Sequence, residues 1–422
     1  MVFSSLLLRE LKAFLKNPAF VVSIVIILSF YTFMGRVIST GTETAVREVE
    51  KASIGVVIED LNDILLEALK ILNKTYSIKL YSSPQDGFGE SVAIIVFPHG
   101  FVENITSNGT VRLRTYVSVS GLNLMVYQVR VAFINRFIDD LSNAIVFTYG
   151  NIHNVTLPIG FRIETHNSAV FQGKTINEYL FNTIVSFASF APLLVGLMMG
   201  INASYSSQIT AVEKDEKAFE MLLAQPVSRR NIVLAKIIAS ITASIINGLV
   251  LLIALILMGA AQVTLIEQTP RYEPYVNYES LENISFTNTI LVLLFSLVIG
   301  LVYSGAMGVI VGSIVHDTRT AGVLTTPLML IFMGFSLIPL FMGLPVSETL
   351  SILYGVFVTP LTYLYMYSTL SGNLSYFVIG IASSITTCLS LIALSIYVFE
   401  RDIVVTGLRI SFKKIPVSRD SH

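Results

Sequence analysis

Residues 213–236 read EKDEKAFEMLLAQPVSRRNIVLAK, a strongly charged segment that contains a proline and an arginine pair. Long apolar runs lie on its two sides, at 179–201 and 237–261. A helix needs about 20 apolar residues to cross the ~30 Å hydrocarbon core of a bilayer, because each residue advances it by about 1.5 Å. The stretch therefore predicts two membrane-spanning helices joined by a charged connection in water.

The composition of the whole chain agrees with a membrane protein. Of its 422 residues, 53% are hydrophobic and only 13% are charged, whereas soluble domains carry about 25% charged residues. The net charge is −1 and no basic stripe exists to neutralise phosphates, which argues against a nucleic-acid partner. The single cysteine, Cys388, excludes a disulfide within the chain and a thiolate metal cluster.

Three more apolar runs have the length of one span each, at 20–38, 287–315 and 321–344. The first run follows a basic stretch, as a signal peptide does, but it is longer than the usual apolar region of about 7–15 residues. We therefore expect residues 1–38 to hold an amphipathic helix in the membrane interface, at 3–15, followed by the first span.

Residues 349–399 carry no charge but are too long for one helix. Gly355, Pro360 and a Ser-Gly-Asn turn sequence interrupt them. Two full spans would fit this region, and so would one span at 376–399 preceded by a re-entrant pair of short helices at 350–370. The second arrangement gives six spans in total and leaves both termini on the same side of the membrane.

Basic residues predict the orientation, since short loops rich in Lys and Arg stay in the cytoplasm. They gather near the start of the chain, in the charged segment and in the tail 401–422, whereas loops 262–286 and 343–376 hold one basic residue, Arg271. The sequence thus predicts a multi-pass protein of the plasma membrane, with both termini and the tail cytoplasmic and residues 39–176 outside. The membrane domain would cover 177–400.

Residues 39–176 have the character of a soluble α/β domain. Continuous or alternating apolar runs predict strands, and a 3.6-residue period predicts helices. The fold class expected is an α-helical polytopic membrane protein, with six spans plus a re-entrant helical pair, and an extracytoplasmic α/β domain. Its expected elements are strands at 54–58, 76–81, 92–97 and 111–120, and helices at 61–72 and 122–147.

The second of these helices carries apolar residues at alternating spacings of three and four, a heptad pattern. Two interpretations stay open: the seam packs on the sheet of its own domain, or it contacts a second protomer. The residues of the seam are Leu124, Tyr127, Val131, Ile134, Ile138, Leu141 and Ile145.

Motifs for chemistry are weak, and we nominate no catalytic, cofactor-binding or metal-binding residue. Gly173-Lys174-Thr175 looks like the tail of a phosphate loop, but Ser168 stands where a glycine is required and no strand is predicted before it. The five histidines are scattered. The spans also lack the central ionisable residue that ion-coupled carriers usually hold.

The charged segment is expected to form a helix, a sharp turn and a second helix across 205–232. Pro226 cannot continue a helix interior, and Ser228 is a good N-cap for the helix that follows. The turn at 225–230 would then project from the membrane. A simpler alternative stays open, in which charges gather as at any cytoplasmic loop and the arginine pair contacts lipid headgroups.

The same segment resembles the coupling-helix signature of ABC transporter permeases of the type-2 exporter class. Ala218-Phe219 stands where that family often has a glycine. Residues 8–18 are similar to the family's amphipathic connecting helix, and 92–101 to a strand element of the subgroup with a large outer domain. The matching positions are Glu213, Glu220, Met221-Leu222-Leu223, Pro226-Val227-Ser228-Arg229 and Lys236.

This resemblance implies a non-enzymatic permease subunit, present with a second copy or a paralogue, in contact with membrane lipid and bound to two cytoplasmic ABC ATPase subunits. The ATPases would bind ATP-Mg, so no cofactor is expected in this chain. A membrane-anchored sensor using the outer domain, an ion-coupled secondary carrier and a membrane enzyme are the alternatives. The resemblance assigns ATPase coupling to Glu213, Glu220, Gln225, Pro226, Ser228, Arg229 and Arg230.

Overall fold

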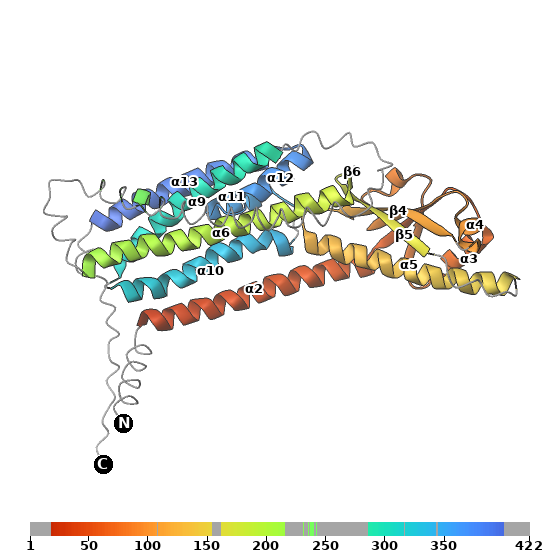
Figure 1. Cartoon of the computed structure of the whole chain (residues 1–422), viewed down its shortest axis with the longest axis horizontal. Helices are drawn as coiled ribbons and strands as arrows, with labels where there is room; N and C mark the ends of the chain where they lie inside the picture. Colours follow the sequence, from red (N-terminus) through yellow and green to blue (C-terminus); the bar gives the residue numbers. More distant parts are fainter. Residues whose placement is uncertain are drawn as a thin grey trace, which may run out of the picture.

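The computed structural model describes residues 18–215 without 108 and 154–161, residues 286–400 without 316 and 343–344, and a few positions between 231 and 242. The molecule is elongated, with a sheet domain at one end and a bundle of long helices forming the rest (Figure 1). The predicted helix at 3–15, most of the predicted span at 237–261 and the tail 401–422 lie outside the described residues.

One mixed sheet of six strands forms the centre of the sheet domain, in the order β2-β1-β3-β4-β5-β6. β1 pairs in parallel with β2 and β3, β4 runs antiparallel to β3 and parallel to β5, and β6 turns back against β5. The strands are β1 Ser53–Ile58, β2 Ser77–Leu80, β3 Ala93–Phe97, β4 Thr110–Val119, β5 Arg162–Phe171 and β6 Lys174–Asn177.

The prediction of β1 to β4 is confirmed within a residue or two, whereas β5 and β6 were missed. β5 reads RIETHNSAVF, and only its last three residues are buried, so it carries no alternating pattern. Its backbone is satisfied by ten residue pairs with β4. Strand formation here depends on a long neighbouring strand more than on local sequence.

Helix α3 (Asp63–Leu72) is N-capped by Asn62, whose side-chain oxygen accepts from the Ile64 backbone N–H at 2.9 Å. It packs against α5 (Leu124–His153), and both contribute to one core cluster with the strands. The shorter helices of the domain are η1 Pro84–Gly87 and α4 Phe101–Thr106. The predicted apolar face of α3 is confirmed as its buried face, formed by Ile64, Leu65, Ala68, Leu69 and Leu72.

The heptad seam of α5 packs within its own chain. Tyr127, Ile134, Leu141 and Ile145 are fully buried in the core cluster that α5 shares with the sheet and α3. The first of the two interpretations of the seam is therefore correct, because these side chains have no surface left for a second protomer.

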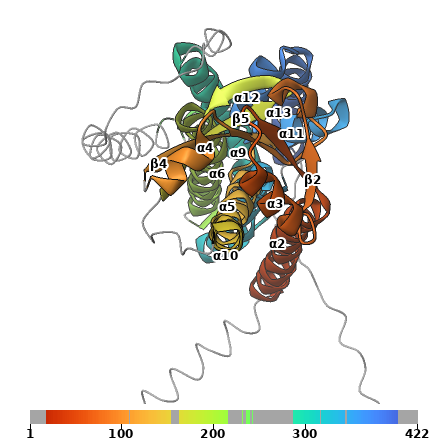
Figure 2. The ribbon, with the colours of Figure 1, turned by 90° about the vertical axis from the view of Figure 1, so that its right-hand side faces the viewer.

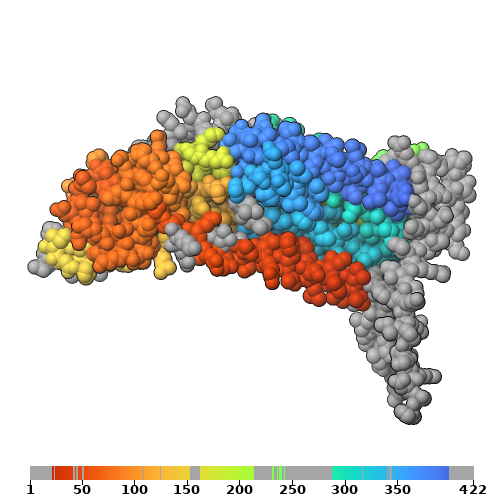
Figure 3. Space-filling view, turned by 180° about the vertical axis from the view of Figure 1, so that it is seen from behind, coloured from red at the N-terminus to blue at the C-terminus, as the bar shows by residue number. Residues whose placement is uncertain are grey.

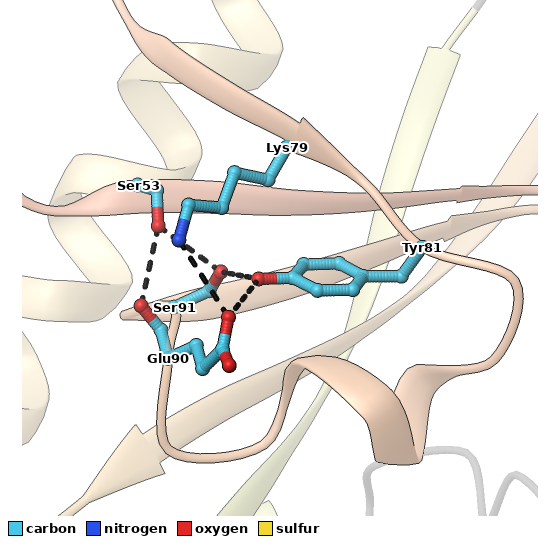
Figure 4. A network of polar contacts seen from close by, with 5 residues as sticks. All are labelled: Ser53, Lys79, Tyr81, Glu90 and Ser91. Atoms are coloured by element: carbon cyan, nitrogen blue, oxygen red, sulfur yellow. Dashed lines mark hydrogen bonds and ion pairs between the residues drawn. The ribbon is translucent and has the colours of Figure 1, made fainter.

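The other face of the sheet is covered by the loop that contains η1. The Tyr81 ring lies over Gly55, where an added Cβ would be 3.0 Å from the ring. The Tyr81 hydroxyl is 3.2 Å from Ser91 Oγ and donates to Glu90 Oε2 at 3.3 Å (Figure 4). These contacts fix the loop to the sheet, and a side chain on Gly55 would displace the ring.

Seven described helices build the membrane bundle. Stretches of four of them are long and apolar enough to cross a membrane among the residues searched: Glu178–Val212, Asn288–Ile314, Thr318–Pro339 and Ser375–Val398. The chain is therefore a helical membrane protein with about four apolar spans plus the α/β domain. The helices are α2 Pro18–Lys51, α6 Glu178–Asp215, α9 Phe286–Ile314, α10 Thr318–Met342, α11 Glu348–Phe357, α12 Leu361–Ser371 and α13 Ser375–Glu400.

Two of these helices run beyond the spans expected from hydropathy. α2 holds the apolar stretch Ile24–Thr40 but continues to Lys51 and reaches α5 of the sheet domain. α6 likewise continues past residue 201 to Asp215. Helix continuity is maintained by backbone hydrogen bonds, so it need not end where the apolar run ends.

The bundle is arranged around α6, which packs on α9 and α10. α2 packs on the far side of α10 and lies along the outside of the bundle (Figures 2 and 3). α13 covers α9 and α11. Several helix ends lie at the end of the bundle away from the sheet (Figure 1). They are the start of α2, the ends of α6 and α13, and the connection from α9 to α10.

Candidate functional site

The predicted coupling segment begins in the last turn of α6. Glu213 lies within this helix, at the end of the bundle opposite the sheet domain. The other six predicted coupling residues, from Glu220 to Arg230, lie outside the described residues. The structure therefore describes the helix that carries the segment and leaves the docking turn itself untested.

α6 is held against α9 by very close backbone contact. A Cβ added to Gly312 of α9 would lie 2.5 Å from the Ser207 carbonyl oxygen and 2.7 Å from Thr210 Cβ. Gly308, one turn earlier, likewise faces Ala203 and Ser206. Small residues spaced four apart allow two membrane helices to approach closely and gain dispersion contacts.

Hydrogen bonds reinforce the same contact. The fully buried Asn202 of α6 donates from Nδ2 to the Leu301 carbonyl at 2.6 Å and to Ser304 Oγ at 2.9 Å. Ser206 Oγ donates to the Gly305 carbonyl at 2.8 Å. Interhelical hydrogen bonds of this kind contribute on average about 0.6 kcal/mol each in membranes. These polar side chains serve helix packing.

α10 contacts α6 on its other side in the same manner. A Cβ on Gly196 would lie 2.7 Å from the Phe332 carbonyl oxygen, and one on Gly200 would lie within 3 Å of the Met329 side chain. α6 thus lies between α9 and α10, which follow one another in the chain. α6 is therefore in close backbone contact with both helices.

α2 and α10 line an open apolar hollow of about 330 Å³. Phe30, Phe33 and Phe335 are among its lining residues, and Ser29 supplies the only polar side chain of the lining. Such a lining suits hydrocarbon and offers no group for chemistry.

The helices α11 and α12 lie near the sheet-domain end of the bundle (Figure 1). Ser347 caps α11, accepting from the Leu350 backbone N–H at 3.3 Å, and Gly372 ends α12 with a φ of +75°. Ser384 of α13 donates to the Gly355 carbonyl at 2.8 Å, which fixes α11 against α13. α12 is almost entirely buried.

Part-buried polar groups join the sheet domain to α6. Asn167 of β5 donates from Nδ2 to Glu178 Oε1 at 3.4 Å and accepts from Thr115 Oγ1. The Tyr127 and Phe181 rings lie 4.9 Å apart. Burial raises the pKa of the Tyr127 hydroxyl well above its usual value, and the nearby carboxylate raises it further.

A buried arginine joins the sheet domain to α2. Arg130 of α5 donates to Glu48 at 3.1 Å and to the Ser118 carbonyl, and 9% of its side chain is exposed. Burial lowers the pKa of the guanidinium, while Glu48 opposes this shift. A buried cation is tolerated when it is paired in this way.

The segment Gly173-Lys174-Thr175 forms a hairpin turn and the start of β6. A strand does precede it, contrary to the prediction, but another strand follows where a phosphate loop requires a helix. Lys174 instead donates to the Leu370 carbonyl at the end of α12, at 3.1 Å. Among the described residues no group of three or more His, Cys, Asp or Glu side chains could hold a metal ion.

Comparison with known proteins gives one match. The family model described as ABC-2 family transporter protein matches residues 18–399. No curated protein and no solved structure matches the chain.

Proposed function

Because the chain belongs to the ABC-2 family of transporter proteins, we propose that it is the permease subunit of an ATP-driven exporter. It is a multi-pass membrane component of a transporter, and the family resemblance drawn from residues 213–236 is confirmed. In the proposed assembly two cytoplasmic ATPase subunits bind ATP-Mg and dock on 205–232. A second permease copy or a paralogue completes the substrate pathway.

The observation that carries this proposal is the continuity of α6. It is one helix of 38 residues, from the sheet-domain junction at Glu178 to Asp215 inside the charged segment, and such a helix is about 57 Å long. Its close glycine-mediated contacts with α9 and α10 support the proposal that a movement of α6 acts on both helices. A displacement that an ATPase causes at one end of α6 would therefore be transmitted to the helices packed along it.

The proposed topology has six spans, both termini in the cytoplasm and the sheet domain outside. The four described spans and the apolar stretch of α2 support it, and 237–261 supplies the sixth span. α11 and α12 have 10 and 11 residues, which gives lengths of about 15 and 17 Å and makes each too short to cross the bilayer. They form the proposed re-entrant pair.

The composition of the spans supports an external energy source. Within the four described spans, Asp, Glu, His, Lys and Arg occur only at or next to the ends, as Glu178 and Arg319. An ion-coupled carrier would need such a group near the membrane centre. No observation favours a sensor or a membrane enzyme over a permease.

Charge reversal of the docking turn tests the proposal. Arg229→Glu with Arg230→Glu should lower co-purification of the ATPase at least tenfold, measured by azido-ATP labelling and ATPase activity of the purified complex. The matched control is Lys70→Glu with Lys74→Glu, which makes the same charge change on exposed residues of the sheet domain. Unchanged ATPase recovery with the arginine variant would show that the assignment is wrong.

A further inference from the structure

The turn between β5 and β6 reaches from the sheet domain to a helix of the bundle. Gln172 and Gly173 form a two-residue turn with φ values of +49° and +81°. Two successive positive φ values are typical of the tight turn that matches the twist of a hairpin. The hairpin is therefore a defined structure, and Phe171 and Lys174 leave it at fixed positions on either side of the turn.

Three groups of this hairpin contact the last turns of α12. Lys174 Nζ donates to the Leu370 carbonyl at 3.1 Å. The Phe171 ring stands perpendicular to the Tyr367 ring, with centroids 5.5 Å apart. The Gln172 side chain also lies close to the Tyr367 hydroxyl. Phe171 is fully buried and Tyr367 is 2% exposed, so the ring contact excludes water, whereas Gln172 and Lys174 are exposed.

Lys174 lies at the C-terminal end of α12, where a cation that donates a hydrogen bond stabilises the helix. Leu370 belongs to the last four residues of α12, whose carbonyl groups have no partner within the helix. A cation at a helix C-terminus is also favoured by the helix dipole. Lys174 therefore completes the end of α12 from another domain, 196 residues away in the chain.

This contact differs from the other attachments of the sheet domain. α2 and α6 are covalently continuous with the domain and also share polar contacts with it, that of the buried Arg130 with the exposed Glu48 and that of the part-buried Asn167 with Glu178. α12 has no such continuity and meets the domain through side chains. Opening this attachment breaks side-chain contacts and leaves the backbone hydrogen bonds of the hairpin and of α12 in place.

We propose that the β5–β6 hairpin is a latch on α12. Phe171, Gln172 and Lys174 hold the C-terminal end of α12 against the sheet domain, so α12 and the sheet domain move as one body while the latch is closed. Movement of α12 relative to the domain requires the latch to open. The latch needs no ATPase and is thus independent of the proposed function.

Hydrogen exchange of the full chain in nanodiscs tests the latch. Lys174→Met keeps the aliphatic stem but removes the donor, so exchange of the amides of 368–374 should rise about three- to tenfold, as expected for the net contribution of one hydrogen bond from an exposed side chain. Lys174→Arg should restore protection. Lys79→Met is the matched control, because Lys79 is a half-exposed lysine of the same sheet that pairs with Glu90 (Figure 4).

The reverse perturbation separates a latch from a local effect. Tyr367→Phe removes the hydroxyl, keeps the ring against Phe171 and should raise exchange of the hairpin amides at 171–175. If the hairpin is a latch, Lys174→Met changes amide exchange in α12 and Tyr367→Phe changes amide exchange in the hairpin. If Lys174→Met increases exchange only in the hairpin and leaves 368–374 within twofold of the unmodified protein, the contact is incidental and the proposal is wrong.

Discussion

Gly312→Ala is the sharpest test of how α6 and α9 are packed. The added Cβ would lie 2.5 Å from the Ser207 carbonyl oxygen, whereas an ordinary contact needs a separation of more than 3 Å. Because backbone atoms are involved, no side-chain rotation relieves the clash and the helices must separate. Separation also lengthens neighbouring hydrogen bonds, such as that from Ser206 Oγ to the Gly305 carbonyl at 2.8 Å.

The expected cost follows from these contacts. Overpacking a tight interface costs about 1–3 kcal/mol, and each weakened interhelical hydrogen bond costs about 0.6 kcal/mol. Alanine regains about 1 kcal/mol through its higher helix propensity. The free energy of unfolding should therefore fall by about 1–3 kcal/mol. Gly322→Ala is the matched control, since no atom lies within 4 Å of its added Cβ, and it should be neutral or stabilising.

The chain supplies its own probe for this measurement. Cys388 is the only cysteine, and it is buried on α13 with 8% exposure. A thiol-reactive dye would report its exposure on heating in detergent, and Gly312→Ala should lower the midpoint by several degrees relative to Gly322→Ala. Equal midpoints for the two variants would refute the close packing of α6 on α9.

Two further predictions concern the sheet domain. Glu48→Ala leaves the buried Arg130 without its carboxylate and should lower the free energy of unfolding by about 1–3 kcal/mol. Glu43→Ala is the control, because it breaks only an exposed pair and should cost less than about 1 kcal/mol. Thermal midpoints measure both variants, and equal midpoints would contradict the prediction. Burial, and next the hydrogen bond to Asp140 at 2.5 Å, raises the pKa of Tyr76 from 10.0 to about 12. The neutral phenol is favoured in the folded state, so this stability is fully present below about pH 10 and is lost as the pH rises toward 12. Tyr76→Phe should be less sensitive to alkali in this window, and an unchanged pH profile would contradict the assignment.

Local sequence predicted the parts of the fold whose signal is periodic. The buried face of α3, the fully apolar β3 and the spans in α6, α9, α10 and α13 all follow from the spacing or length of apolar residues. Such patterns arise because each element must bury one face or fill one membrane thickness. They are carried by neighbouring residues, so one sequence is enough to detect them.

The extension of α2, the strand β5 and the hairpin could not be predicted in this way. The RIETHNSAVF stretch pairs because β4 offers it a complete set of backbone partners. The extension of α2 beyond its apolar run is buried at Val49 against the rest of the molecule. Neither feature has a local hydrophobic signal, because the compensating contacts come from distant segments.

Sequence by itself determined that this chain is a multi-span protein with an α/β domain and a charged connection between two apolar runs. Hydropathy and the spacing of apolar residues establish this, because both are read from residues that are neighbours in the sequence. Only the tertiary structure decided what the individual polar residues do. Lys174, which stands in a sequence that resembles only the tail of a phosphate loop, completes the end of α12. Asn202 joins α6 to α9. The physical reason is that a buried hydrogen bond depends on which groups packing brings together, and packing joins residues far apart in the chain.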